Sequence, residues 1–234
     1  MLLYADLHIH SCLSPCGDEL MTPNNIVNMA MLKGLDIISV TDHNTCANLP
    51  AVFSAAHRAG ITVIPGMEME TAEEVHTLAY FPSLEAAMKF SDAAYSFLPP
   101  IENNPRFFGE QIVLDENDEP VRTEPRLLLS PLSLTLEEGF ELVRQFGGVA
   151  VPAHIDRPSH GIIPILGFIN PHLGVCCVEV SPLGMANGFS HFDPRLRVLS
   201  SSDAHDLGAI LERQQELDLP ECSTEAFLSY ISGK

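Results

Sequence analysis

The chain has 234 residues and a formal net charge of −19 at pH 7, from 31 acidic and 12 basic side chains. Its 46% hydrophobic content supports one domain with a substantial core, and no run reaches the roughly 18 apolar residues of a membrane span. The acidic balance disfavours long nucleic-acid duplexes, whose phosphates need basic surfaces, but allows a small phosphorylated substrate beside bound metal ions. With no secretory signal and six sparse cysteines, we expect a cytoplasmic protein without a membrane partner.

Strands and helices alternate along most of the sequence. Apolar runs predict strands near 2–10, 35–41, 61–67, 75–80, 148–153, 174–180 and 196–201. Cap and stop signals predict helices near 22–33, 48–59, 84–97, 135–147 and 223–231, and a loop followed by a helix is expected within 155–170. This alternation implies parallel strands joined by right-handed crossovers, within one domain over 1–234. The stretch 99–131 breaks the rhythm, and we interpret it as a surface insertion containing a β-hairpin.

The first expected strand carries polar side chains on one face. Because side chains alternate along a strand, Asp6, His8 and His10 point one way and their apolar neighbours the other. An H-x-H pair alone is a weak signal of a metal site. Imidazoles and carboxylates recur, however, at the ends of the later strands: His43, Glu68, Glu70, His76, His154, Asp203 and His205. The carboxyl ends of parallel barrel strands meet at one face, so these groups are expected to converge there.

The ordered series resembles the polymerase and histidinol phosphatase (PHP) superfamily of metal-dependent phosphoesterases. The matching motifs are Asp6-Leu7-His8-Ile9-His10, Thr41-Asp42-His43-Asn44, Glu68, His76, His154 and Ser202-Asp203-Ala204-His205. The resemblance implies an α/β fold, a distorted (β/α)7 TIM-like barrel with a site for two or three divalent metal ions at its carboxyl face. Activities in the superfamily include hydrolysis of histidinol phosphate, nucleotides and nucleoside bisphosphates, and exonuclease action.

The resemblance also implies a ligand set. The family's pattern gives one metal ion to His8, His10, Glu68 and Asp203, and a second to Glu68, His76 and His154. A third would take His43, His205 and one residue from the loop after the first motif. That loop departs from the usual Ser-Asp-Gly, since it has Ser14-Pro15-Cys16-Gly17-Asp18. We favour Asp18 as this ligand, with Cys16 as the alternative.

Imidazole combined with carboxylate suits Zn²⁺, Mn²⁺ or Fe²⁺. We therefore expect hydrolysis by a metal-activated hydroxide, since a metal lowers the pKa of water from about 15.7 to about 7. Asp203, His205 and Arg157 are assigned catalytic roles, and Arg157 and His160 are assigned to substrate binding. Asp42 is expected to orient a ligand histidine. For Asp6, an orienting role and a buried structural role are equally open.

The leading hypothesis is a metal-dependent phosphoric ester hydrolase, a phosphatase or phosphodiesterase, acting on a small phosphomonoester or nucleotide. Two alternatives remain: an amidohydrolase-type metal hydrolase, which also opens with H-x-H on a first barrel strand, and a non-catalytic metal-binding regulatory module. The insertion at 99–131 could shape substrate access or form an oligomer contact, and the sequence does not decide between them.

Overall fold

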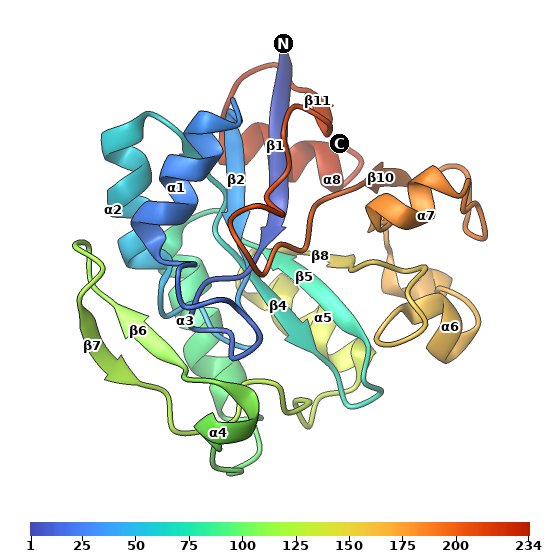
Figure 1. Ribbon diagram of the computed structural model, residues 1–234. Coiled ribbons are helices and arrows are strands. Elements are labelled where there is room, and N and C mark those ends of the chain that lie inside the picture. Colours follow the sequence, from blue (N-terminus) through green and yellow to red (C-terminus); the bar gives the residue numbers. More distant parts are fainter.

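The computed structural model describes residues 1–234 as a mixed α/β fold built from several small sheets (Figure 1). The first sheet has the order β11-β1-β2-β3. Its strands are β1 (Leu2–Ile9), β2 (Ile37–Val40), β3 (Thr62–Val63) and β11 (Glu216–Asp218). β1, β2 and β3 run parallel, with Ala5 opposite Ile37, whereas β11 pairs antiparallel with β1.

The second sheet differs from the expected all-parallel arrangement. It consists of β4 (Gly66–Glu70), β5 (His76–Tyr80) and β8 (Val149–Pro152), and β5 runs antiparallel to both neighbours. The physical reason is the short turn at 71–75, because a parallel crossover needs a dozen or more residues. The strand expected over 61–67 is likewise divided between β3 and β4.

The third sheet consists of two parallel strands, β9 (Cys177–Glu179) and β10 (Arg197–Leu199). The remaining pair, β6 (Ile112–Leu114) with β7 (Pro120–Thr123), is the hairpin expected in the insertion, where α4 (Pro105–Phe108) precedes it. Strand hydrogen bonding thus leaves four separate sheets and does not close one barrel. An isolated parallel bridge between Ile9 and Ala204 brings the loop after β10 against the end of β1.

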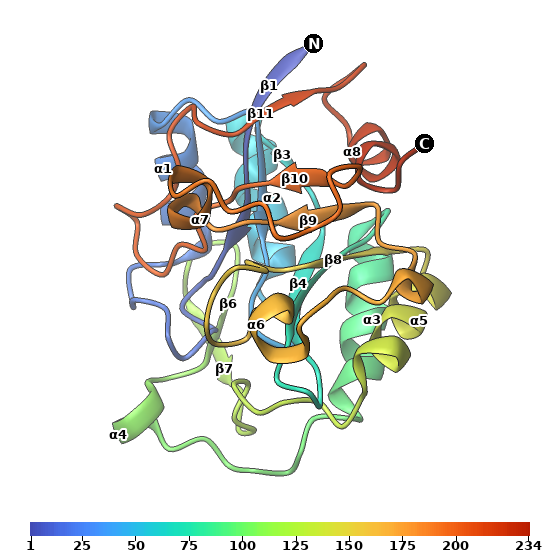
Figure 2. The same cartoon turned by 90° about the vertical axis from the view of Figure 1, so that its right-hand side faces the viewer.

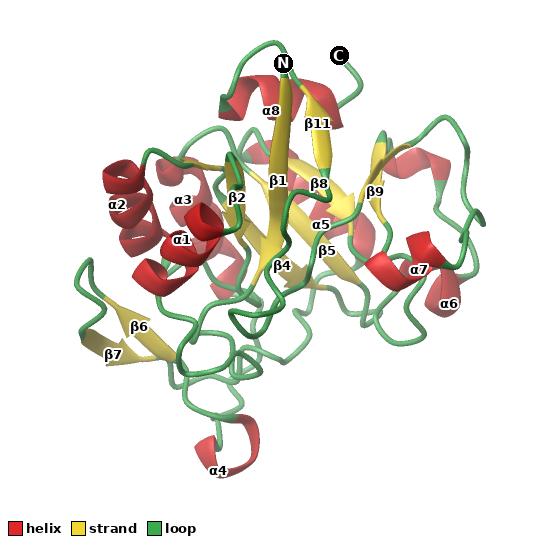
Figure 3. Cartoon of the chain, turned by 45° about the horizontal axis from the view of Figure 1, so that its top comes forward, coloured by secondary structure: helices red, strands yellow, loops and turns green.

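Helices cover the outside of the sheets (Figures 1 and 3). They are α1 (Pro23–Leu32), α2 (Leu49–Ala59), α3 (Leu84–Tyr95), α5 (Leu136–Gln145) and α8 (Thr224–Ile231), all close to their predicted positions. The sequence signals explain the boundaries, since Thr22 caps α1 and Thr135 with Glu138 forms the capping box of α5. None of the helices combines the length and apolarity that a membrane crossing requires.

The segment after β8 contains the loop and the helix expected within 155–170. The helix is the short α6 (Ile162–Leu166), because Gly161 and Gly167 bound it, and a 3₁₀ turn at Pro171–Leu173 follows. A further short helix, α7 (Pro182–Ala186), and strand β11 were not predicted. Figure 2 shows α6 and α7 on the side of the molecule formed by β8, β9 and β10.

Asp6 has a structural position in the core. It is fully buried, and its carboxylate accepts hydrogen bonds from the Ser202 amide (3.0 Å), the Ser202 hydroxyl (2.6 Å) and the Leu211 amide (2.9 Å). Burial raises the pKa of Asp6 despite these bonds. The residue therefore ties β1 to the loop that carries Asp203, which favours the structural role over direct orientation of a ligand.

Replacing Asp6 by alanine leaves the Ser202 and Leu211 amides without an acceptor, while the Ser202 hydroxyl keeps only the His8 carbonyl oxygen at 3.2 Å. We therefore expect Asp6→Ala to lower the free energy of unfolding by about 3 kcal/mol. Urea titration followed by circular dichroism measures the change. Asp218→Ala is the matched control, because that side chain is 88% exposed and should shift stability by less than about 0.5 kcal/mol. An Asp6→Ala protein as stable as the control would contradict this role.

Candidate metal centre

Glu68 lies at the centre of the site. It is 1% exposed, on β4, and five imidazole rings surround its carboxylate. The nitrogen-to-oxygen distances are His8 Nε2 3.3 Å, His10 Nε2 3.2 Å, His43 Nδ1 3.2 Å, His76 Nδ1 2.9 Å and His154 Nε2 3.2 Å. The structure thus brings together groups that are spread over nearly 150 sequence positions.

The strands explain the convergence. His8 and His10 share one face of β1, His76 begins β5, and the other ligand candidates follow the ends of β2, β8 and β10. Two of these strand ends have unusual backbone, with φ of 26° at His154 and 53° at Asp203. Non-glycine residues rarely adopt this left-handed conformation, and such strain concentrates at functional sites.

Asp203 completes the first group of side chains. One carboxylate oxygen, Oδ1, lies 3.2 Å from His8 Nε2 and 3.0 Å from His10 Nε2. The other oxygen pairs with the guanidinium of Arg157, whose side chain is 39% exposed. Arg157 thus stands between the buried cluster and solvent, where an incoming anion would meet it.

Sequence reasoning missed Glu179, at the end of β9. Its buried carboxylate contacts His8 Nδ1 at 2.9 Å and accepts a hydrogen bond from the His154 amide at 3.0 Å. Glu179 therefore orients the His8 ring, which is the usual role of carboxylates behind metal-binding histidines, and it fixes the backbone that carries His154. The sequence did contain a signal for Glu179, because this carboxylate stands at the end of an apolar run, and the same pattern identified Glu68.

His10 is oriented from behind by a hydrogen-bonded chain. Its Nδ1 lies 3.0 Å from the Ser14 hydroxyl, which donates to Asp42 at 2.7 Å. Asp42 also accepts from the amide and hydroxyl of Ser11. Asp42 therefore reaches the ligand histidine through Ser14, a partner that the sequence did not indicate.

A second group contains Cys16, His10, His43 and His205, whose candidate ligand atoms all lie within 4.8 Å of one another. Asp18 is not in it, because its carboxylate accepts from the Leu20 amide at 2.8 Å and only its backbone amide reaches His205. The geometry therefore favours Cys16 over Asp18.

A third group lies nearer the surface. His160 Nδ1 is 3.5 Å from Glu70 Oε1, and the opposite oxygen of Glu70 is 3.8 Å from His76 Nε2. The His76 and His160 rings stack with their centroids 4.2 Å apart. His160 is therefore part of the site, with its side chain 38% exposed at the entrance.

The charges of the cluster are strongly coupled. Burial disfavours protonation of His8, but the carboxylates of Glu68 and Asp203 outweigh it and raise its pKa well above the usual value. Burial also opposes protonation of His76, yet Glu68 raises its pKa to about 9. Burial lowers the pKa of His43 well below normal and that of His205 to about 4. Protons on some of the imidazole rings neutralise the negative charge of the buried carboxylates. A metal cation can supply this positive charge instead.

The donor set fits divalent metal ions. Glu68 Oε2, Asp203 Oδ1 and His43 Nδ1 are buried without a hydrogen-bond partner, which is costly unless another group satisfies them. The ring nitrogens of His8 and His10 face each other at 3.2 Å, and at least one lone pair there requires an electrophile. Mixed imidazole and carboxylate donors suit Zn²⁺, Mn²⁺ or Fe²⁺.

The cluster opens into a cleft of about 290 Å³. Its lining residues are Cys16, His43, Glu68, Glu70, His76, Leu129, His154, Arg157, Ser159, His160, Asp203 and His205. All but four of the candidate site residues from the sequence are among them: His8 and His10 lie beneath the surface of the cleft, Asp42 lies behind Ser14, and Asp18 points elsewhere.

The chain belongs to the PHP domain family, whose pattern matches residues 6–141, more than half of its length. This confirms the family that the motif series indicated. The match includes every strand end from the first H-x-H pair to His76, while His154, Asp203 and His205 lie beyond it.

Curated relatives match over shorter stretches. A 5'-3' exoribonuclease, Rnm, of Salmonella typhimurium is 36% identical over 75 residues, or 31% of this chain and 25% of its own length. A phosphoribosyl 1,2-cyclic phosphate 1,2-diphosphodiesterase of Eggerthella lenta is 32% identical over 78 residues, covering 31% and 29% of the two chains. The matches thus span between a quarter and a third of these relatives. Their names agree with the predicted enzyme class.

Solved structures cover the whole chain. The lesion-specific endonuclease PfuEndoQ of Pyrococcus furiosus aligns with a TM-score of 0.67 at 22% identity, over 100% of this chain and 56% of its own. A structure of Endonuclease Q in complex with a 27-mer duplex aligns equally well at 21% identity, over 100% of this chain and 57% of that one. At this identity the likeness establishes the fold.

These comparisons correct the predicted partners. We expected a small phosphorylated substrate and no long nucleic-acid duplex, on the basis of the charge of −19. A neighbour with the same fold binds a duplex, and a relative is named as an exoribonuclease, so that prediction was wrong. The inference failed because net charge describes the whole surface, whereas metal ions can set the sign of the potential at the site itself.

The orienting role of Glu179 gives a direct test. Glu179→Gln keeps the shape of the side chain but weakens the bond to His8 Nδ1, so we expect affinity for the first metal ion to fall about 10- to 100-fold. Competition against a fluorescent chelator measures the affinity. Glu141→Gln, on the exposed face of α5, is the control and should bind as the unaltered protein does. Equal affinity of both variants would argue against this role.

Proposed function

We propose that the chain is a metal-dependent phosphoesterase that hydrolyses phosphoester bonds of a nucleic acid. The observation that carries the proposal is the cluster around Glu68, in which five imidazoles and the Asp203 carboxylate converge at the base of an open cleft. Arg157 at the rim supplies the cationic fork that phosphate recognition needs. The family membership and the names of the relatives support the same reaction class.

We assign the metal ligands from this geometry together with the sequence motifs. His8, His10, Glu68 and Asp203 would hold one ion, and Glu68 with His76 and His154 a second, adjoined by His43. Cys16, His43 and His205 would hold a third. When bound, such ions polarise phosphoryl oxygens, neutralise their charge and lower the pKa of water.

The protein residues then position the substrate. Arg157, released from Asp203 when a cation occupies the cluster, can donate two parallel hydrogen bonds to a phosphate. His160, at the entrance, can donate a further bond while its stacking on His76 fixes the ring. Glu179 and Asp42 hold His8 and His10 in place, so little reorganisation is needed when the phosphate arrives.

The size of the cleft supports a polymeric substrate. Ligand sites usually measure about 300–1,000 Å³, and the metal cleft, at about 290 Å³, lies at the lower limit. A phosphate group with its ester oxygens fits, and the rest of the substrate must lie outside the cleft. We therefore propose a strand whose scissile phosphate enters the metal cleft while its neighbouring nucleotides lie outside this cleft.

We propose that β1, β2, β4, β5, β8, β9 and β10 form a distorted barrel-like arrangement of the seven predicted strands. Two isolated bridges between separate sheets, His43–Glu68 and Ile9–Ala204, support this arrangement. We propose that 1–234 forms one such unit, with 99–131 as an insertion on it.

The function is tested with protein loaded in turn with Mn²⁺, Zn²⁺ and Fe²⁺. We expect hydrolysis of single-stranded oligonucleotides and of bis-p-nitrophenyl phosphate, and none of amide or lactone substrates, which an amidohydrolase would turn over. Arg157→Ala should lower kcat/KM about 10- to 100-fold, because a charged hydrogen bond contributes about 1.5–3 kcal/mol. Leu32→Ala is the control, because this side chain is 80% exposed at the end of α1 and is not among the residues that line the cleft. A fully loaded protein that hydrolyses no phosphoester would refute the proposal.

The group formed by Cys16, His43 and His205 yields a separate prediction. Cys16→Ser should lose about one bound metal ion per chain, whereas Asp18→Asn should lose none, since only the thiol reaches His43 and His205. Mass spectrometry of the native protein counts the ions. Loading with Co²⁺ gives a second readout, because a sulfur-to-cobalt absorption band requires Cys16. The reverse result, loss of an ion in Asp18→Asn alone, would assign the ligand to Asp18.

A further inference from the structure

A second cavity adjoins the metal cleft. It measures about 640 Å³ and lies between the loop at 156–158 and the segment 181–191, which includes α7. Arg157 lines both this side cavity and the metal cleft. Arg157 therefore borders both the proposed phosphate position and the space toward α7.

The wall of the side cavity is held in a fixed position. Asp156 accepts hydrogen bonds from the Ser181 amide (2.7 Å) and hydroxyl (2.5 Å), and the same hydroxyl accepts from the Gly184 amide (3.0 Å). A side chain at Gly184 would collide with the Asp156 carboxylate. The loop that carries Arg157 is thus tied directly to the opposite wall of the cavity.

The side cavity is poor in free negative charge. Asp156 is the one acidic residue among those that line it, and both of its oxygens are occupied by Ser181. The other ionisable side chains there are Arg157 and His191. In a chain with 31 acidic residues, this is a surface that an anionic strand can approach with little repulsion.

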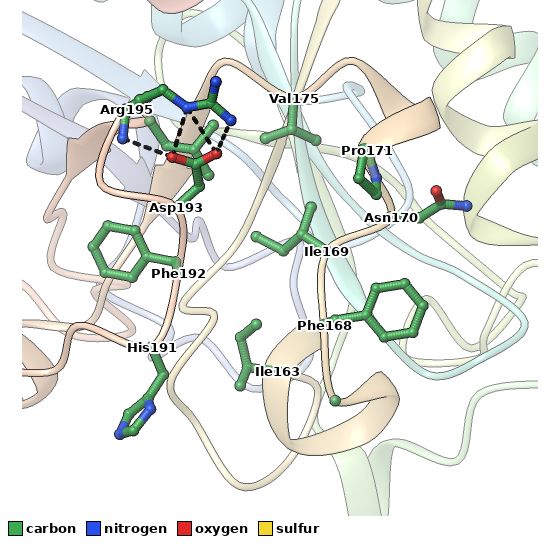
Figure 4. Close-up of a pocket in the computed structure, with 12 residues that line it drawn as sticks. Ile163, Phe168, Ile169, Asn170, Pro171, Val175, His191, Phe192, Asp193 and Arg195 are labelled. Atoms are coloured by element: carbon green, nitrogen blue, oxygen red, sulfur yellow. Dashed lines mark hydrogen bonds and ion pairs between the residues drawn. The ribbon is translucent and has the colours of Figure 1, made fainter.

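Aromatic rings line the outer part of the path. The Phe189 and His191 rings lie 5.6 Å apart between centroids, and Phe189 and Phe192 are 6.1 Å apart with an interplanar angle of 25°. His191 also borders a third cavity of about 440 Å³. Figure 4 shows Phe192 and Phe168 on opposite sides of this cavity, with His191 at its edge.

We propose that the side cavity binds the nucleotide next to the scissile phosphate of a single-stranded nucleic acid, with its base against Phe189 and His191. The proposal rests on the proposed function and names the strand-binding subsite of the same centre. Single-strand binders combine a cationic contact to the backbone with aromatic rings on which bases stack, whatever their sequence. Arg157 and the two rings supply this combination along one continuous surface.

The test compares binding and turnover in the metal-loaded protein. Phe189→Ala should weaken binding of a fluorescein-labelled oligodeoxythymidylate of about six nucleotides at least tenfold, measured by anisotropy. The KM for that oligonucleotide, divided by the KM for bis-p-nitrophenyl phosphate, should rise by a similar factor with little change in kcat. Phe189→Tyr keeps the ring and should restore both values. Oligouridylate run in parallel shows whether RNA or DNA binds better.

Phe107→Ala is the matched control, because this ring is 82% exposed on α4 and lies outside the three cavities. The proposal is overturned if Phe189→Ala binds the oligonucleotide as tightly as the control does, or if the KM values for both substrates rise equally. Anisotropy requires no turnover, so this result stands apart from the failure of the proposed function, which is absence of hydrolysis by the unaltered, loaded protein.

Discussion

A buried carboxylate among five imidazoles is the constraint on which the structure depends. Glu68 is 1% exposed at the base of the cleft, and its two oxygens are surrounded by groups from β1, β5 and the loops after β2 and β8. Proteins rarely retain such a concentration of ionisable groups for stability, because desolvation costs as much as the pairing returns. A site for cations explains why the side chains at so many strand ends converge on Glu68.

The surrounding architecture serves to hold this point rigid. Glu179 contacts His8, Asp42 reaches His10 through Ser14, and Asp6 anchors the loop that carries Asp203. None of these three carboxylates needs to touch a substrate. Each holds a side chain or a loop at the end of a strand in a fixed position, and chemistry that depends on positioning and electrostatics requires such rigidity.

Much of the fold and of the candidate site could be predicted from the sequence, because the signals lie in short stretches of neighbouring residues. Apolar runs ending in histidine or carboxylate identified the ring around Glu68, and cap residues identified the long helices. Loop geometry was not readable: counting along the chain could not decide between Cys16 and Asp18, which differ in the turn that carries them.

Longer-range effects were also hidden. The antiparallel course of β5 follows from a short turn, and the contact of Glu179 with His8 joins positions 171 residues apart. Net charge misled for a related reason. It averages over the surface, whereas the proposed substrate binding depends on the local charges of one cleft and its neighbouring cavity.

The most direct measurement is anomalous diffraction from crystals of the protein loaded with Mn²⁺. The account predicts at least two anomalous peaks within coordination distance of the Glu68 carboxylate, one of them also contacting His8, His10 and Asp203. Peaks confined to surface carboxylates, with the Glu68 cluster free of metal at saturating Mn²⁺, would contradict it.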